Sequence, residues 1–188
     1  REPFLTTLPY YRTIAVFVTR EDAPFEVSSL DDPLLRDLRI GVLAGSPEDY
    51  ALVKRGMIES VRHFYASDGD AAILEAVVDG NLDLGIVWGP VAGYQAQQLG
   101  APLALTPVSP ELDMPFIPMF QALSFAMRSD DVALADLLNA ALERRWDEVQ
   151  EVLASFGVPL LPLDRPSPVL EAAPVNSLRI GVVLPTLT

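Results

Sequence analysis

The sequence has no cysteine and only one histidine, His63, among its 188 residues. The absence of cysteine excludes disulfides, thiol nucleophiles and thiolate metal sites. A single histidine excludes metal sites built from several histidines, and most Ser–His–Asp triads. No apolar run approaches the roughly 18 residues that a membrane-spanning helix needs. We therefore expect no metal site and no membrane span.

Positive charge is also scarce: the chain has 13 Lys and Arg residues and 26 Asp and Glu residues, which gives a formal net charge of −13. This balance excludes nucleic-acid binding, which needs a basic face to neutralise phosphates. Hydrophobic residues make up 50% of the chain, which is ample for a core in one domain or two small lobes. The chain begins at Arg1 rather than Met and shows no signal peptide. That beginning indicates a processed or truncated product.

Between residues 38 and 106, short β-rich runs alternate with helical patterns. The runs are Leu38–Leu43, Val61–Ala66, Leu82–Trp88 and the weaker Leu103–Thr106, with helices expected at 47–56, 71–79 and 90–99. Strands separated by helices of this length are typical of βαβ units. The sequence therefore predicts an α/β fold with a parallel sheet.

The helix boundaries in this region have local signals. Ser46 is a suitable N-cap, Pro47 fits the first helical position, and Asp49 stands three residues after the cap, as in a capping box. Asp70 can cap the second helix and Gly80 can end it. These signals favour helices at 47–56 and 71–79.

Two further strand patterns, at 13–19 and 121–127, flank the α/β region, and a long helical pattern follows at 131–156. Asp130 can cap that helix and Gly157 can end it. We interpret the flanking strands as hinge strands, outside the central unit, that lead with the helix to a second lobe.

Prolines cluster at 159–174, which is typical of a linker, and the tail 177–188 (SLRIGVVLPTLT) is similar to 38–45. An isolated strand cannot bury itself. The tail must therefore pair with this molecule's sheet, pair with another chain, or begin a further domain, unless the similarity is coincidental.

In open α/β sheets, ligands bind beyond the carboxyl ends of the strands. Here that edge consists of 44–49, 67–70 and 88–94. Ser46 can offer a hydroxyl and a helix start to an anion, or can simply be an N-cap. Trp88 and Tyr94 can form an aromatic wall or belong to the core. Asp68 and Asp70 can bind a cation or amine, although capping accounts for one of them.

Catalytic patterns are weak throughout. Three carboxylate pairs, Asp31-Asp32, Glu48-Asp49 and Asp130-Asp131, lie at turns or helix starts, where sequence neighbours usually point apart. His63 lies in a strand pattern and is most simply a structural histidine. No glycine-rich phosphate-binding motif is present. We therefore expect no catalytic residues, no cofactor and no enzymatic activity.

The order of these elements resembles the second lobe and hinge of type II periplasmic solute-binding proteins. It is most similar to the subgroup encoded beside PQQ-dependent alcohol dehydrogenases, which includes the J proteins of methanol-oxidation operons. IVWGPVAGY and LPYYR are the most specific parts of a similarity that covers about 5–162. The matching segments are Leu8–Arg20 (LPYYRTIAVFVTR), Ser29–Val42 (SLDDPLLRDLRIGV), Val77–Tyr94 (VVDGNLDLGIVWGPVAGY), Pro102–Val108 (PLALTPV) and Asn139–Pro159 (NAALERRWDEVQEVLASFGVP).

The resemblance implies a periplasmic binding protein type II-like fold, in which a doubly wound sheet forms lobe two. Residues 18–112 would form lobe two, while 1–17 and 113–162 would supply hinge strands and the C-terminal helix of a partial lobe one. A Pro-rich linker and strand-like tail, 163–188, would follow. The N-terminal half of lobe one would be missing from this polypeptide.

Two functions follow from the resemblance. One is a periplasmic accessory protein that binds a quinoprotein dehydrogenase or its cytochrome without catalysis; the alternative is an ABC-transporter receptor for a small solute. Amino-acid receptors of this fold usually carry an acidic residue where Trp88 stands here, which favours the first. Sensing domains of transcription regulators and modules of cell-wall enzymes share the fold, but they need further domains. The expected cleft residues are Tyr10, Tyr11, Ser46, Ser67, Asp68, Trp88, Gly89 and Tyr94.

Overall fold

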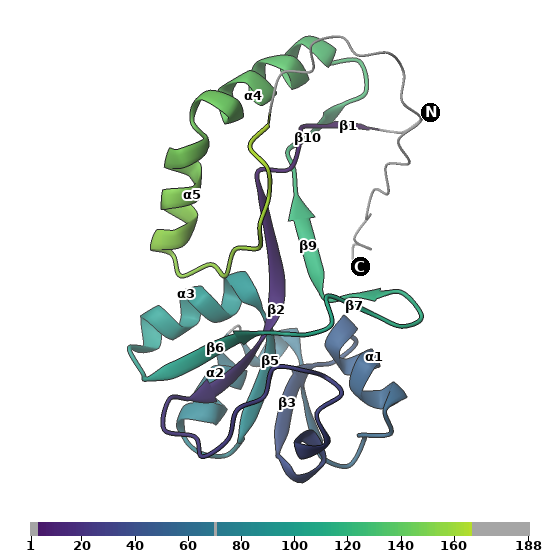
Figure 1. The fold of residues 1–188 in the computed structure, drawn as a ribbon, viewed down its shortest axis with the longest axis vertical. Coiled ribbons are helices and arrows are strands. Elements are labelled where there is room, and N and C mark those ends of the chain that lie inside the picture. The colour runs from purple at the N-terminus through teal and green to yellow at the C-terminus, as the bar shows by residue number, and fades with distance from the viewer. Residues whose placement is uncertain (1–3, 70, 167–188) are drawn as a thin grey trace.

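The computed structural model describes residues 4–69 and 71–166 and consists of two parts joined by long strands. Figure 1 shows a lower α/β part and an upper part dominated by two helices, with strand β2 (Tyr11–Arg20) running through both. Asp70 and the tail 177–188, to which the sequence assigned a helix cap and a strand, lie outside the described residues.

The lower part is built on a sheet with the strand order β4-β3-β5-β2-β6. Strand β3 (Ile40–Leu43) pairs in parallel with β4 (Val61–Phe64) and with β5 (Leu84–Trp88). Strand β2 is antiparallel both to β5 and to β6 (Leu103–Pro107). The expected α/β fold is therefore confirmed, but the sheet is mixed rather than parallel, because β2 lies between two strands that run the opposite way.

The position of β2 corrects the interpretation of 13–19 as a hinge strand outside the central unit. Ala15 pairs with Trp88 and Val16 pairs with Pro107, so this half of β2 is inside the sheet. Val16 and Val18 pack on one face, while Ile14 and Phe17 pack on the other. A strand buried on both faces reads as a continuous apolar run, which explains its sequence TIAVFV.

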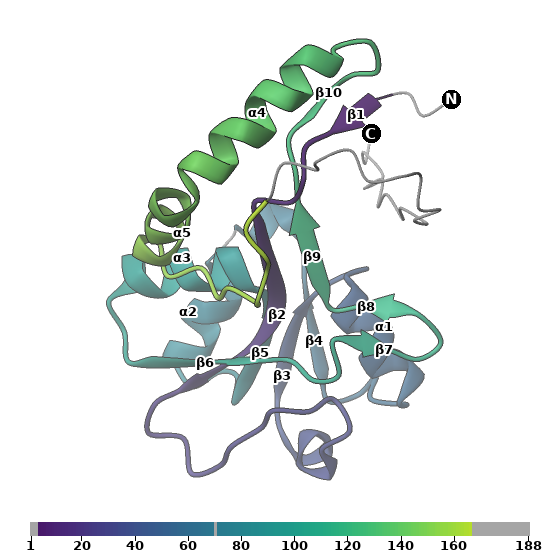
Figure 2. The same ribbon diagram turned by 45° about the horizontal axis from the view of Figure 1, so that its top comes forward.

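Helices cover both faces of this sheet. Helix α1 (Pro47–Lys54) and the short 3-10 helix η1 (Pro33–Asp37) place Leu52 and Leu35 in one buried cluster. Helices α2 (Ala72–Val78) and α3 (Gly89–Leu99) pack on the other face, where Leu74 is fully buried. Figure 2 shows α1 and the pair α2–α3 on opposite sides of the sheet. The lower part therefore has a buried hydrophobic cluster on each face of its sheet.

The upper part has a smaller framework. Strand β9 (Phe120–Leu123) pairs with the first half of β2, and β10 (Ala126–Arg128) pairs with β1 (Phe4–Thr6). The predicted strand 121–127 is thus two strands. The strand pairing is interrupted at Phe125, whose N–H donates to the Thr7 hydroxyl rather than to a backbone carbonyl of a neighbouring strand.

The predicted helix 131–156 is also divided, into α4 (Val132–Arg144) and α5 (Trp146–Ser155). Arg145 leaves helical geometry, with φ −107° and ψ 17°, and Trp146 turns into the interior. The N-cap is Asp131 rather than Asp130, and its carboxylate pairs with Arg128 instead of capping the helix. A one-residue break hardly disturbs a 3.6-residue pattern, so the pattern did not reveal it.

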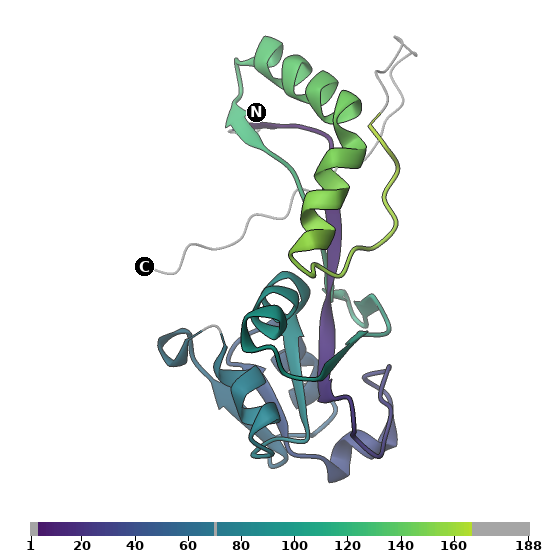
Figure 3. The same cartoon turned by 90° about the vertical axis from the view of Figure 1, so that its left-hand side faces the viewer.

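The segment after α5 returns along β2. Gly157, with φ 68°, ends the helix as expected, and Leu160 forms a bridge with Thr13. The Leu161 N–H donates to the Arg12 carbonyl at 2.8 Å. The first residues of the expected linker 159–174 are therefore paired with β2; Figure 3 shows the chain that follows α5 starting near the lower end of that helix and then turning upward.

Helices α4 and α5 carry much uncovered apolar surface. Leu142 and Trp146 are buried, but Leu137 is 64% exposed. The other exposed large apolar side chains on these helices are Val132, Leu134 and Val152, and Phe156 follows α5. The upper part therefore covers its helices far less completely than the lower part does. No helix of the described residues is long and apolar enough to cross a membrane.

A short hairpin, β7 (Leu112–Asp113) and β8 (Ile117–Pro118), connects β6 with β9 and packs beside α1. Its inner residue Ile117 contacts the lower core. The hairpin lies at the side of the molecule, below β9 in Figure 1.

Candidate functional site

Three parallel strands end at the same edge of the lower sheet. Leu43 of β3 pairs with Phe64 of β4, and β3 also pairs in parallel with β5. The segments that follow Leu43, Phe64 and Trp88 therefore lie side by side along this edge. Since Ala15 pairs with Trp88, the half of β2 before Ala15 extends beyond the edge toward the upper part. The edge therefore faces the hinge, which is the place predicted for a binding site.

Ser46 lies on this edge as the N-cap of α1. Its hydroxyl accepts from the Asp49 N–H at 3.2 Å, which confirms the predicted cap. The Asp49 carboxylate does not complete a capping box with Ser46; one oxygen accepts from the Gly45 N–H at 2.9 Å and the other contacts His63 Nε2 at 2.9 Å. His63 is therefore a structural histidine, as expected.

Replacing Ser46 by alanine is expected to lower the free energy of unfolding by about 1 kcal/mol, because the Asp49 N–H loses its acceptor. Chemical denaturation measures the change. Ser46→Thr, which keeps a hydroxyl, is the matched control and should recover most of it. An alanine variant as stable as the wild type would contradict the capping role.

The neighbouring carboxylates do not act in pairs. Burial raises the pKa of Glu48, whereas Asp49 is bonded to His63. Asp32 caps η1 by accepting from the Leu34 N–H, while Asp31 binds Arg55. Since the members of each pair have different partners, the geometry offers no acid–base pair at these positions.

Ser67 and Asp68 follow β4 in the short 3-10 helix η2 (Ala66–Asp68), and both are exposed. One oxygen of the Asp68 carboxylate accepts from the Tyr65 N–H at 2.8 Å. This bond supports the capping alternative for Asp68. Ser67 lies on the same edge, and its side chain makes no hydrogen bond to the other described residues.

Trp88 and Gly89 form the junction between β5 and α3. A side chain at Gly89 would place its Cβ 2.4 Å from the Ile14 carbonyl oxygen and 2.9 Å from Thr13 Oγ1, so glycine is required for close backbone approach. Trp88 Nε1 is buried and has no hydrogen-bond partner among residues 4–69 and 71–166. A buried indole N–H without an acceptor is costly.

Tyr94 lies farther along α3, and its ring is 6.2 Å from that of Phe156, the residue that follows α5. Tyr10 and Tyr11 belong to the upper part. The Tyr10 ring stacks on Phe125 at 4.7 Å and meets Tyr11 edge-on at 5.1 Å. Burial raises the pKa of the Tyr11 phenol.

The eight expected site residues therefore fall into three groups. Ser46, Ser67, Asp68, Trp88 and Gly89 lie on the edge of the lower sheet. Tyr11 is four residues from Ala15, which pairs with Trp88, so the tyrosines lie roughly 13 Å along β2 from that edge. Tyr94 lies at the contact between α3 and α5. The structure thus arranges most of the set around the hinge, with its two ends well separated.

The two hollows described for the structure lie elsewhere. One is at the opposite edge of the sheet and the other is beside η1. The first is lined by Arg39, Ile40, Glu59, Ser60, Val61, Arg62, Asn81 and Leu82; the second by Leu30, Asp31, Asp32, Pro33, Arg36, Arg55 and Met57. Within the described ranges, no group of three or more His, Asp or Glu side chains could hold a metal ion.

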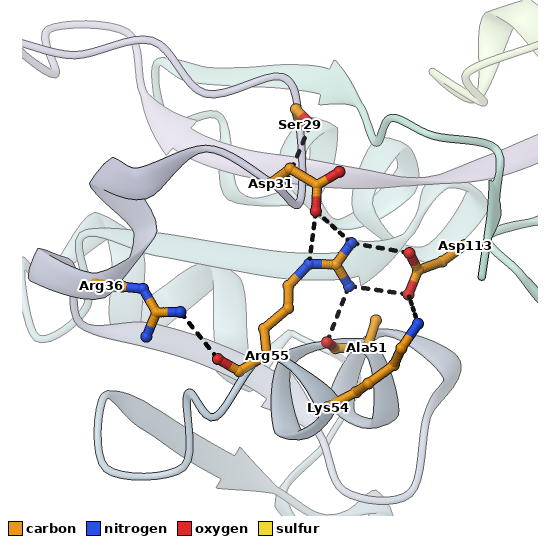
Figure 4. A network of polar contacts seen from close by, with 7 residues as sticks. All are labelled: Ser29, Asp31, Arg36, Ala51, Lys54, Arg55 and Asp113. Carbon is orange, nitrogen blue, oxygen red and sulfur yellow. Dashed lines mark hydrogen bonds and ion pairs between the residues drawn. The ribbon is translucent and has the colours of Figure 1, made fainter. Parts of the chain in front are cut away.

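Sequence reasoning missed an ion-pair network beside the second hollow, shown in Figure 4. The Arg55 guanidinium donates to both Asp113 oxygens, at 2.8 and 2.9 Å, and to Asp31 at 2.7 Å. Lys54 Nζ lies 3.8 Å from Asp113, whose side chain is only 5% exposed. The hydrogen bonds from Arg55 hold the pKa of Asp113 below its usual value. Arg55 and Asp113 are 58 residues apart, so no local pattern could reveal their pairing.

Comparison with known proteins gives relatives but no matching family model. The protein MoxJ of Methylorubrum extorquens AM1 is 28% identical over 176 residues, which are 85% of this chain and 59% of MoxJ. The MoxJ of Paracoccus denitrificans is 28% identical over 178 residues, covering 86% of this chain and 64% of that protein. The chain thus spans about three fifths of the length of the curated relatives it matches.

A solved structure agrees with this result. The crystal structure of the periplasmic binding protein XoxJ from Methylobacterium extorquens AM1 matches with a TM-score of 0.73 and 29% identity, over 85% of this chain and 74% of that chain. The resemblance inferred from IVWGPVAGY and LPYYR is confirmed. This chain is a homologue of the MoxJ proteins and has the fold of the periplasmic binding proteins.

Proposed function

We propose that this chain belongs to a periplasmic accessory protein of a PQQ-dependent methanol or alcohol dehydrogenase system, and that it acts by binding rather than catalysis. The similarity to MoxJ supports the family, and the name of XoxJ as a periplasmic binding protein supports the compartment. The partner is the dehydrogenase or its cytochrome. The proposal requires no cofactor in the chain itself.

The observation that carries the proposal is the identity of the residue at the end of β5. Amino-acid receptors of this fold usually hold the ligand's ammonium group with a carboxylate there, whereas this chain has Trp88. The indole N–H is a donor and cannot replace a carboxylate as acceptor. The acid of the expected set, Asp68, already accepts from the Tyr65 backbone. This edge is therefore poorly suited to bind an amino acid.

The charge of the chain supports a protein partner. A net charge of −13 on 188 residues creates a field that attracts a basic protein from a distance and raises the association rate. Salt screens such attraction, with a Debye length of about 8 Å at physiological ionic strength. Binding through this field must therefore weaken as salt increases.

A receptor for a small solute is the second candidate. It is favoured by the two strands, β2 and β9, that join the upper and lower parts, and by Ser46 at the helix start on the edge between them. A solute that binds the folded chain more tightly than the unfolded chain would raise the melting temperature. A thermal-shift screen of amino acids and small alcohols separates the two candidates.

We further propose that the upper part is a partial lobe one. The exposed apolar side chains on α4 and α5, such as Leu137 and Val152, support this proposal, because a complete lobe would cover them. Residues 18–112 would be lobe two, with 1–17 and 113–162 in the hinge and lobe one. Since β2 pairs within the lower sheet from Ala15 onward, the boundary crosses this strand rather than a loop.

The test is binding of the immobilised chain to a purified PQQ-dependent methanol dehydrogenase and, separately, to its cytochrome. We expect binding to one of them at about 20 mM NaCl and at least tenfold weaker binding at about 300 mM, because the attraction is long-ranged. Lysozyme, a basic protein with no role in this system, is the control for charge alone. Equal binding of lysozyme, or no binding of either probe, would contradict the proposal.

A further inference from the structure

The hairpin between β6 and β9 presents large apolar side chains to solvent. Phe116 is 78% exposed, the highest value among the large apolar side chains of the described residues, and Met114 is 63% exposed. Ile117, the next residue along β8, packs against the lower core. The turn before β8 thus exposes Phe116, while the first residue of the strand faces the core.

The neighbouring helix continues this surface. Tyr50 and Val53 of α1 are 61% and 42% exposed. Tyr50 shares a helix face with Lys54, four residues later, and Lys54 reaches the hairpin at Asp113. We call the five exposed residues of these two adjacent elements the hairpin patch: Tyr50, Val53, Leu112, Met114 and Phe116.

The hairpin is held in place rather than free to collapse. Asp113, the last residue of β7 before the turn, accepts hydrogen bonds from both terminal nitrogens of Arg55, as Figure 4 shows. The Phe116 N–H donates to the Asp113 carbonyl at 2.9 Å, which closes the turn. The ion pair of Asp113 therefore anchors the turn that carries Met114 and Phe116.

The backbone of Phe116 is unfavourable for a residue of its kind. Its φ is 140°, the one positive value recorded for a non-glycine residue in the described part of the chain. Backbone strain at a bulky residue persists where the surroundings enforce it, and it clusters at sites of recognition. Because Phe116 is mostly exposed, packing within the described chain does not offset this strain.

We propose that the hairpin patch is the docking surface for a basic protein that receives Phe116 and Met114 in an apolar recess. This inference rests on the proposed function, since it assigns the surface by which the chain contacts its dehydrogenase or cytochrome. Two copies of this chain, each carrying −13, repel one another, which disfavours a second copy as the occupant. A partner of opposite net charge is attracted instead.

The charges beside the patch refine this assignment. Glu111 pairs with Arg12, while Asp31 and Asp113 share Arg55 and Lys54 as their cations. Because these carboxylates are already paired with cations of the same chain, the attraction for a basic partner comes from the net charge of the whole chain. The selectivity for one partner comes from the exposed side chains of Met114 and Phe116. Apolar anchors at the centre of an interface contribute most of its binding energy.

The decisive variant is Phe116→Gly, which removes the apolar ring and suits the positive φ. The full chain and the variant are titrated with purified methanol dehydrogenase and with its cytochrome at about 20 mM NaCl. We expect the variant to bind at least about tenfold more weakly. Its melting temperature should equal or exceed that of the wild type, because glycine adopts this backbone freely. The matched control, Leu137→Ser, alters a similarly exposed residue on α4 and should bind within about twofold of wild type.

The outcomes separate the inference from the proposed function. If the wild type binds and Phe116→Gly binds equally well, the docking surface is wrong and the accessory role stands. If the wild type binds neither probe, the accessory role is wrong, and a photo-crosslinker placed at position 116 in the native host tests the patch directly. A crosslinked basic protein that, once purified, binds the wild type at least tenfold more tightly than Phe116→Gly then supports the inference. No crosslink, or a crosslink only to a second copy of the chain, overturns it.

Discussion

Replacing Arg55 by methionine is expected to lower the free energy of unfolding by about 3–5 kcal/mol, because it leaves the Asp113 carboxylate buried without its bidentate partner. The side chain of Asp113 is 5% exposed, and Lys54 at 3.8 Å is too distant and too exposed to replace the guanidinium. Urea unfolding at neutral pH measures the change.

Arg39→Met is the matched control for this prediction. Arg39 also makes a bidentate contact, with Asp83, but its side chain is 58% exposed, so solvent already screens the pair. We expect a much smaller loss for Arg39→Met than for Arg55→Met. Equal losses would show that burial of Asp113 does not determine the cost.

The pH dependence of the same variant follows from the lowered pKa of Asp113. A carboxylate whose pKa is depressed in the folded state stabilises the fold above its unfolded pKa, near 3.8. That contribution is lost as the pH falls through the lower, folded pKa. The stability gap between wild type and Arg55→Met should therefore narrow as the pH falls, because the wild type loses this contribution below about pH 3.8 while protonation relieves the unpaired carboxyl of the variant.

Replacing Gly93 by alanine is expected to cost roughly 3 kcal/mol, at the upper end of the range for overpacking. The new Cβ would lie 1.9 Å from the Gly157 carbonyl oxygen and 2.5 Å from its carbon. Both obstacles are backbone atoms, so α3 and the end of α5 must separate. Hydrogen exchange should rise at Gly157 and Val158, where the junction opens, and unfolding in urea should give the stability loss.

Gln98→Ala provides the comparison on the same helix. Gln98 is exposed, and its substitution should change stability by no more than about 0.5 kcal/mol. If Gly93→Ala leaves both stability and exchange unchanged, then the close contact between α3 and the α5 terminus is not maintained in solution.

Local signals in the sequence were sufficient where the structure depends on neighbouring residues. Ser46 caps α1, and Gly80 and Gly157 follow helices with φ of 73° and 68°, as expected for glycine at a helix end. The choice of residue at these positions is dictated by backbone geometry within one turn. The helices at 47–56, 71–79 and 90–99 were therefore predicted to within a few residues.

The sequence failed where the structure depends on distant partners. The apolar run in β2 indicates a buried strand, but whether it lies in a hinge or between β5 and β6 depends on pairing with residues far along the chain. The break at Arg145 is invisible because Trp146 stays in phase with the apolar pattern. The Arg55–Asp113 pair has no sequence signature, since ion pairs over 58 residues are fixed only by folding.

The candidate site shows the same division. The segment after each parallel strand was correctly expected at one edge, because topology alone brings strand ends together. Tyr10 and Tyr11 lie beyond that edge, where Tyr10 stacks on Phe125, so their place in a cleft stays a prediction. The exposure of Phe116 and Met114 was not anticipated, since an apolar residue in a sequence carries no sign of being outside the core.

The most direct test of the account is a calorimetric titration of the full chain with two kinds of ligand in parallel. One is purified PQQ-dependent methanol dehydrogenase with its cytochrome, and the other is a set of amino acids and small alcohols. The proposed accessory role predicts saturable, salt-sensitive heat with one of the proteins and none with the small molecules. Saturable binding of a small molecule, without binding of either protein, would contradict it and identify the chain as part of a solute receptor.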